Sequence, residues 1–292
     1  MMQSRRPEIV TAFILLAPFV VIYGVLFVYP TVRMVFLTFT NSPLIGSGNW
    51  VGLSNYYRLF SDHLFSSSVW NTFYFVLLSV VPSTILGLLI ALGENRLKGW
   101  TQSAVLAAFF LPYILPVSVV FRIWLWLLDS QFGIYQYPIA YFYGQNITIF
   151  RTLWLFMPAV AFITVWWLIG FNVLLFIAGL RNISREIYEA SELDGATRWQ
   201  QFTRITWPLI WPITVLVGTI QLILQLKIFD QVYLFSYGGR VDATLTMVQL
   251  IYRTAFQNNK GGYGATIALV LFVLIVVVSV LQYQLLRLRE QR

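Results

Sequence analysis

The polar side chains with the clearest capacity for chemistry are amides inside an apolar stretch of the chain. Gln221 and Gln225 are four residues apart and Gly218 precedes Gln221 by three, so all three share one helix face. Each amide offers donors and an acceptor, which suits the hydroxyl groups of a sugar. The same side chains could instead bond to neighbouring helices, as polar membrane residues commonly do. Thr164 and Asn172 allow the same two interpretations, a solute-binding face or an internal polar contact.

Arg122 is the one basic residue that falls well inside an apolar stretch. An ionisable group at such depth is costly and is by default a functional candidate. A guanidinium can bind a carboxylate, sulfonate or phosphate through two parallel hydrogen bonds, which would make the solute an anion. The other interpretation is structural: the side chain extends to the membrane surface or pairs with Asp129, about two helical turns later.

The sequence contains none of the common catalytic motifs. The chain lacks Cys, a Gly-rich phosphate loop ending in Lys-Ser/Thr, a His-Glu-x-x-His zinc motif and a Gly-x-Ser-x-Gly elbow. We therefore expect no catalysis, no bound metal or cofactor, and no ATP hydrolysis by this chain. Energy for transport must come from another subunit or from an ion gradient. A gradient-driven carrier normally needs acids within the membrane, and the acidic residues here lie almost entirely in loops, which disfavours that alternative.

The composition of the chain indicates that these residues lie in a membrane protein. Of the 292 residues, 59% are hydrophobic and only 10% are charged, whereas an ordinary soluble domain has about 25% charged residues. The net charge of +8 does not indicate nucleic-acid binding, because the basic residues do not gather into one patch. They lie mostly at the ends of apolar stretches, as orientation signals do. The chain is predicted to be an all-α integral membrane protein.

Apolar runs of about twenty residues predict the transmembrane helices. Six spans are expected, at about residues 9–29, 72–92, 103–127, 152–179, 208–226 and 264–285. Basic residues precede the first span, follow the last one and occupy the connections between spans 2 and 3 and spans 4 and 5; they include Arg5, Arg289 and Arg292. The positive-inside rule then places both termini and the connection between spans 4 and 5 in the cytoplasm. No internal repeat is found, so residues 1–292 are predicted to form a single transmembrane domain.

The connection between spans 4 and 5 is polar but structured. Ser184 can cap a short helix over about 185–193, and Gly195 follows where that helix would end in a left-handed residue. Thr197 and Gln200 have capping-box spacing for a second helix before the fifth span. Small residues here let a partner approach the backbone closely, while an amphipathic loop resting on lipid is the alternative. We expect a docking site.

A motif of defined spacing lies within this connection. Its order is Glu189-Ala190-Ser191, three residues, Gly195, nine residues, Ile205, one residue and Trp207-Pro208. It resembles the EAA loop of bacterial ABC-importer permeases, whose pattern is Glu-Ala-Ala, three residues, Gly, nine residues, Ile, one residue and Leu-Pro. The spacing matches throughout, with Ser191 replacing the third motif residue and Trp207 replacing Leu.

Further phrases that resemble sugar-type permeases follow in order and cover essentially the whole chain. They are Trp50-Val51-Gly52-Leu53-Ser54-Asn55-Tyr56, Asn71-Thr72, Leu111-Pro112 with Pro116, Ala178-Gly179-Leu180, Phe229-Asp230, Gly238-Gly239 and Gly262-Tyr263-Gly264-Ala265. Together they point to the subfamily that includes the maltose and glycerol-phosphate permeases. Two positions depart from the pattern, because Ser184 and Arg240 stand where Pro is usual.

The resemblance implies the rest of the machinery. It implies a type I ABC-importer permease core of six transmembrane helices, with a cytoplasmic coupling helix in residues 181–207. The partners would be a second, different permease, two cytosolic ATPase subunits that hold ATP and Mg, and an extracytoplasmic solute-binding protein, in a bacterial cytoplasmic (inner) membrane. Closure of the ATPase pair would rock the spans and import a sugar, glycoside or sugar-like solute. Carried over residue by residue, the ATPase-coupling residues are Glu189, Ala190, Ser191, Asp194, Gly195 and Ala196.

Two functions of other classes stay open. One is a gradient-driven secondary carrier, and the other is a membrane anchor that scaffolds a complex. An intramembrane enzyme is disfavoured because no acid, base or nucleophile cluster is present. Neighbouring genes for a second permease with its own EAA loop and for an external binding protein would favour the importer.

Overall fold

The structure, a computed structural model, describes residues 6–239 and 241–287. Within these ranges the regular elements are helices, together with one isolated bridge between Thr40 and Trp50. The chain divides into two compact units, Met1–Asp62 with Leu250–Phe272 and His63–Gln249 with Val273–Arg292. The prediction of an all-α protein is confirmed for the described part of the chain.

The first unit begins with a long helix. Its apolar stretch, Ile14–Leu37, has 24 residues and is long enough to span a membrane. Its elements are α1 (Arg6–Tyr23), the π-helical η1 (Gly24–Val28), α2 (Tyr29–Leu37), α3 (Ser54–Ser61), the π-helical η5 (Arg253–Gln257) and the first part of α14 (Gly261–Arg287). The hydroxyl of Tyr263 donates to Asp62 Oδ2 at 2.6 Å. The guanidinium carbon of Arg58 lies 4.4 Å from the centre of the Tyr263 ring. These contacts join α3 to the start of α14.

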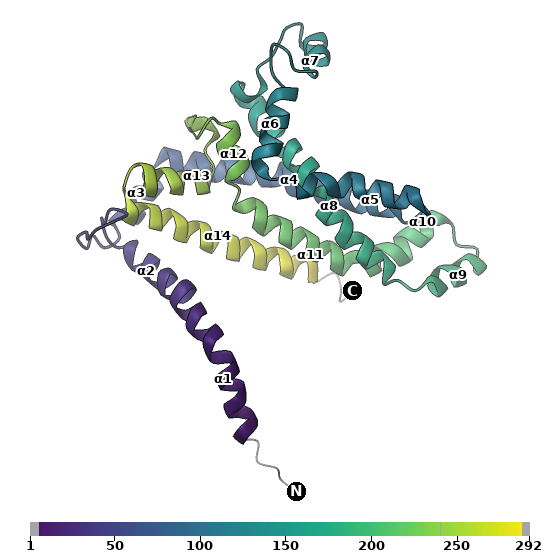
Figure 1. Ribbon diagram of the computed structural model, residues 1–292, viewed down its shortest axis with the longest axis horizontal. Coiled ribbons are helices and arrows are strands. Elements are labelled where there is room, and N and C mark those ends of the chain that lie inside the picture. The colour runs from purple at the N-terminus through teal and green to yellow at the C-terminus, as the bar shows by residue number, and fades with distance from the viewer. Residues whose placement is uncertain (1–5, 240, 288–292) are drawn as a thin grey trace. The chain divides into compact units, whose positions relative to one another are not determined.

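The second unit is a helical bundle in which α8 contacts α4, α5 and α11 (Figure 1). Its elements are α4 (His63–Glu94), α5 (Trp100–Ile114), α6 (Val117–Leu127), α7 (Gln136–Tyr143), η2 (Ile149–Arg151), α8 (Leu153–Arg181), α9 (Arg185–Leu193), α10 (Arg198–Gln201), the π-helical η3 (Phe202–Thr206), α11 (Trp207–Leu226), α12 (Asp230–Phe235), η4 (Asp242–Thr244) and part of α13 (Met247–Tyr252). A Cβ added at Gly87 would lie 2.9 Å from Asn172 Cβ, and one at Gly170 would collide with the carbonyl of Phe109. Small residues thus let the backbones of α4 and α5 approach α8 closely.

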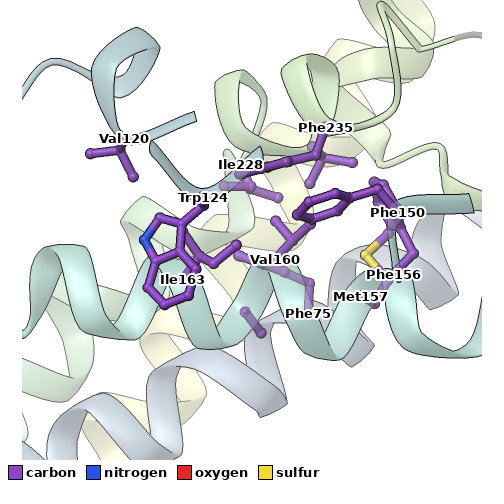
Figure 2. Packing of buried hydrophobic residues seen from close by; sticks show 12 residues of the cluster. Phe75, Val120, Trp124, Phe150, Phe156, Met157, Val160, Ile163, Ile228 and Phe235 are labelled. Atoms are coloured by element: carbon purple, nitrogen blue, oxygen red, sulfur yellow. The ribbon is translucent and has the colours of Figure 1, made fainter. Parts of the chain in front are cut away.

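A cluster of buried apolar side chains, several of them aromatic, packs within this bundle (Figure 2). Phe156 and Val160 of α8 pack with Phe75 of α4, Trp124 of α6 and Phe235 of α12, and all five are buried. Burial of large apolar side chains is the main stabilising contribution to such packing. The cluster therefore fixes the short helices α6 and α12 against α8.

Five helices in the described ranges are long and apolar enough to cross a membrane, and the number rises to six if one bent pair counts as a span. The five are Ile14–Leu37, His63–Glu94, Leu153–Arg181, Arg198–Leu226 and Gly261–Gln284. This agrees with the prediction of an integral membrane protein. Arg5, Arg240, Arg289 and Arg292, which entered the predictions for orientation and the outer loop, lie outside the described residues.

The span expected at 103–127 is broken into two helices, and whether the pair crosses the membrane as one span stays a prediction. α5 ends at Ile114, α6 begins at Val117, and the two meet at a bend of 102°. Pro116 has no N–H for the helix ladder and forces the residue before it out of the helical region. Leu115 accordingly has φ −67° and ψ 136°. Arg122 therefore lies on the second arm of a bend rather than within an uninterrupted span.

Candidate functional site

The amides singled out by the sequence form one hydrogen-bonded chain. Gln225 Nε2 donates to Gln221 Oε1 at 3.1 Å, and Gln221 Nε2 donates to Asn172 Oδ1 at 2.7 Å. Asn172 Nδ2 donates in turn to the carbonyl oxygen of Ser83 at 3.2 Å. All three amide side chains are buried. These four residues, named here the amide ladder, join α11 to α8 and α8 to α4.

The amide ladder matches the structural interpretation in the conformation described, because the amides bond across neighbouring helices. Gln221 is the central member: its oxygen accepts from Gln225 and its nitrogen donates to Asn172. In this conformation the bond between Asn172 and Gln221 occupies one donor and one acceptor site that a solute hydroxyl could otherwise use. The role of the ladder in solute binding stays a prediction.

The other two residues considered for solute contact, in spans 4 and 5, have different surroundings. Thr164 is buried, and its hydroxyl donates to the Val160 carbonyl of the same helix at 2.8 Å. Gly218 lies against α14, since a Cβ there would be 3.0 Å from Gln282 Nε2. The absence of a side chain at Gly218 therefore makes room for an amide of another helix.

Arg122 is exposed on α6. Its guanidinium carbon lies 5.8 Å from the centre of the neighbouring Phe121 ring, and no ion pair within the described ranges includes it. Asp129 is engaged elsewhere: its Oδ1 accepts from the N–H groups of Gln131 at 2.8 Å and Phe132 at 3.3 Å. The alternative that Arg122 pairs with Asp129 is therefore wrong for this structure. Recognition of an anion by Arg122 stays a prediction.

The segment between α8 and α11 adopts the helix-turn-helix that its sequence predicts. The side chain of Ser184 caps α9 by accepting a backbone hydrogen bond at 3.3 Å. Gly195 has φ +75°, a left-handed conformation that glycine adopts without strain. Thr197 and Gln200 make both bonds of a capping box, at 2.7 and 3.3 Å. The local capping predictions are confirmed.

Side-chain bonds fold α9 back onto the helix that follows. The hydroxyls of Tyr188 and Thr206 are 2.9 Å apart, and Gln201 Nε2 donates to Ser191 Oγ at 3.0 Å. The second helix does not stop before the fifth span, because α10, η3 and α11 run on as one helix, Arg198–Leu226. The π-helical turn fits the lack of an N–H at Pro208 in the first turn of α11. The segment is thus built directly onto a spanning helix.

The surface of this segment carries the residues expected to contact an ATPase. Glu189, Ala190, Asp194 and Gly195 are exposed, and Ser191 and Ala196 are partly exposed. Glu189 Oε1 accepts from Arg185 Nε at 2.8 Å in a solvent-exposed pair. Leu193 and Trp199, which sequence reasoning did not assign to the ATPase contact, are 90% and 71% exposed. Large apolar side chains among polar neighbours were the available signal, and such exposure marks interaction surfaces.

Sequence reasoning also missed Glu94, the last residue of α4. Acidic residues were expected almost entirely in loops, yet Glu94 is only 1% exposed at the end of a long apolar helix. Its position directly after the apolar run was the signal that could have indicated burial. In the parts of the chain that the structure describes, no three His, Cys, Asp or Glu side chains gather as a metal site.

Comparisons with known proteins agree with this arrangement. The family described as "Binding-protein-dependent transport system inner membrane component" matches residues 83–290. The chain is 33% identical to the inner membrane ABC transporter permease protein YcjO of Escherichia coli (strain K12), over 95% of this chain and 94% of that protein. It is 29% identical to the sulfoquinovosyl glycerol transport system permease protein SmoG of Agrobacterium fabrum, over 96% and 91%.

Solved structures show the same fold. A chain from the crystal structure of a bacterial ABC transporter involved in the import of the acidic polysaccharide alginate superposes with a TM-score of 0.82. The two chains are 22% identical, and the match covers 97% of this chain and 99% of the other. The chain belongs to the family of binding-protein-dependent transport system inner membrane components.

Proposed function

We propose that this chain is the permease subunit of an ATP-driven importer for a sugar, glycoside or sugar-like solute, with residues 1–292 as one six-span permease domain. A second permease, two cytosolic ATPase subunits holding ATP and Mg, and an extracytoplasmic binding protein complete the transporter. It works in a bacterial cytoplasmic membrane with both termini in the cytoplasm. Family membership supports binding-protein-dependent transport, and the relative named for sulfoquinovosyl glycerol transport supports a glycoside-type solute.

The observation that carries the proposal is the exposed helical segment between α8 and α11, which is continuous with a spanning helix. α9 begins after a short cap that follows α8, and α10 continues into α11 without a break. The same two long helices are joined by the bond between Asn172 and Gln221. A partner that grips α9, the proposed coupling helix, therefore acts on the two helices that the bond between Asn172 and Gln221 joins. Asn172 is nine residues from Arg181 at the end of α8, roughly 14 Å along the helix.

Alternating access follows from this connection. When the ATPase pair closes, the docked α9 moves, and α8 and α11 shift relative to each other. That shift opens the bond between Asn172 and Gln221 and releases their amide groups for solute hydroxyls. The solute then stabilises the conformation in which these groups are free. ATP hydrolysis takes place on the partner subunit, and this chain contributes no catalytic group.

Co-purification tests the proposal. The chain, carrying an affinity tag, is solubilised mildly from its native membrane and its bound partners are identified by mass spectrometry. We expect an ATPase, a second permease and vanadate-sensitive uptake. We expect Glu189→Lys to uncouple ATP hydrolysis from uptake or to lose the ATPase, while the chain still inserts. A gradient-driven carrier would instead purify without an ATPase, and its uptake would stop with a protonophore but continue with vanadate.

A further inference from the structure

Beyond the bend at Pro116, α6 packs on the helical bundle through Val120 and Trp124, and α7 projects from the bundle (Figure 1). We propose that α6 and α7 form an interfacial arm that lies on the phospholipid headgroups of the extracytoplasmic leaflet. α6 leaves α5 at 102°, so α6 runs along the membrane plane when α5 lies along the membrane normal. Its 11 residues and the eight of α7 reach only about 16 and 12 Å. Neither helix can cross a hydrocarbon core of about 30 Å.

The composition of the arm suits an interface rather than water. Residues 130–150 contain no Asp, Glu, Lys, Arg or His. α7 exposes Tyr137, Tyr141 and Phe142 by 80%, 84% and 80%, and α6 exposes Trp126 by 62%. Water penalises a patch of bare rings of this kind. Tyr and Trp are enriched at membrane interfaces, where the ring is apolar and its polar atom reaches the headgroups.

The buried side of the arm holds the exposed rings in place. Gln136 is buried, and its Nε2 donates to the carbonyls of Leu128 at 3.3 Å and Ile147 at 2.9 Å. The ring of Tyr135 stacks on Trp124 of α6, with centres 6.1 Å apart. These contacts fix which face of α7 points outward. The outward face is therefore a defined surface, and it has no occupant within the described part of the chain.

Two features indicate that lipid is the occupant. The ring of Tyr143 meets Trp154, with centres 6.1 Å apart, at the start of α8, where Leu153 and Trp154 are also exposed. The aromatic surface of α7 thus continues onto the exposed apolar surface of a membrane-spanning helix. On α6, Arg122 adds an exposed guanidinium that can pair with the phosphate of a lipid headgroup. A protein partner in water would not explain why the aromatic surface of α7 continues onto the apolar surface of the spanning helix α8.

Fluorescence quenching at single cysteines tests the arm. The chain has no Cys, so each introduced cysteine is a unique labelling site. Tyr141→Cys carries an environment-sensitive fluorophore, and the assembled transporter is placed in lipid nanodiscs. Quenching by lipids spin-labelled near the headgroup is compared with quenching by iodide in water. Asn258→Cys, at an exposed polar position beside Asn259 and Lys260, is the control.

We expect the label at position 141 to lose more fluorescence to the spin-labelled lipid than to iodide, and the label at position 258 to show the reverse order. Quenching at 141 by iodide alone would place the arm in water and overturn the proposal. Protection from both quenchers, with or without the binding protein, would show a protein occupant and also overturn it. Repeating the measurement with the label in Glu189→Lys separates this proposal from the proposed function, because membrane contact does not require ATPase docking.

Discussion

The carboxylate of Glu94 lies 3.7 Å from the guanidinium of Arg181, and these are the last residues of α4 and α8. The Glu94 side chain is 1% exposed, whereas that of Arg181 is 61% exposed. Neither carboxylate oxygen of Glu94 accepts a hydrogen bond from the residues that the structure describes. Arg181 is therefore the one counter-charge found for a carboxylate that burial has removed from water, and it lies just before the cap of α9.

Arg181→Ala should destabilise the protein because it leaves the Glu94 carboxylate buried without a counter-charge. We expect a loss of about 1–3 kcal/mol in the free energy of unfolding. Glu94→Gln removes the buried charge instead, and it should cost less or be neutral. Thermal unfolding of both single variants and of the double variant measures the interaction. If Arg181→Ala costs the same in the Glu94→Gln background, the two residues do not interact.

Gln221→Leu should impair uptake more than Gln225→Leu. Loss of the Gln221 amide leaves both Asn172 Oδ1 and Gln225 Nε2 without their partners, whereas loss of Gln225 removes only one bond of the ladder. We expect uptake to fall by about tenfold for Gln221→Leu, equivalent to about 1.4 kcal/mol. Transport assays in vesicles measure this, and co-purified ATPase serves as the control. Equal effects of the two substitutions, or loss of the ATPase, would count against a role in the path.

Glu189→Lys should uncouple ATP hydrolysis from uptake, because Glu189 is the proposed charged contact with the ATPase. Glu192→Lys is the matched control, since Glu192 is also exposed on α9 and changes the net charge equally. ATPase activity stimulated by the loaded binding protein, measured together with uptake, gives the coupling ratio. Normal coupling in Glu189→Lys, or the same defect in both variants, would remove Glu189 from the docking contact.

Gly195→Val should impair docking of the ATPase for two reasons: it strains the backbone of the turn, and its larger side chain blocks close approach. A Cβ at Gly195 would meet no atom within 4 Å, so a larger side chain causes no clash within this chain. The strain comes from the backbone, because Gly195 has φ +75°. A β-branched residue in the left-handed region is strained by roughly 1–2 kcal/mol. Gly195→Asn tolerates the conformation, so it separates backbone strain from lost access. If both variants lose the ATPase, close approach is required; if only Gly195→Val does, the turn conformation decides. Normal docking in both would exclude Gly195 from the contact.

Arg122→Gln distinguishes an anionic solute from a neutral one. If the guanidinium binds an anion, uptake of an anionic glycoside should fall by about tenfold or more, since charge-assisted pairs are the strong ones. Uptake of a matched neutral glycoside should not change. Equal loss for both glycosides, or none for either, would leave Arg122 without a role in solute recognition. Arg122 is exposed on α6, so we expect the substitution to leave the core intact, and far-UV circular dichroism checks this.

Much of the local structure follows from the sequence alone. The apolar runs indicate the spanning helices, because only long apolar helices satisfy their backbone in lipid. The caps at Ser184 and Thr197 and the turn at Gly195 depend on neighbours within a few residues, so spacing was sufficient to predict them. The spacing of Gln221 and Gln225 likewise placed them on one helix face, where they bond to each other.

Only the tertiary structure decided what faces these residues across the bundle. Helical periodicity shows which side chains share a face, but it does not identify the side chain of another helix that meets them. The bond between Gln221 and Asn172, the burial of Glu94 beside Arg181 and the direction of the bend at Pro116 all depend on contacts between residues far apart in the chain or on packing around the break. The reason is physical: local spacing determines helix ends and faces, whereas the pairing of buried polar groups is determined by the packing of whole helices.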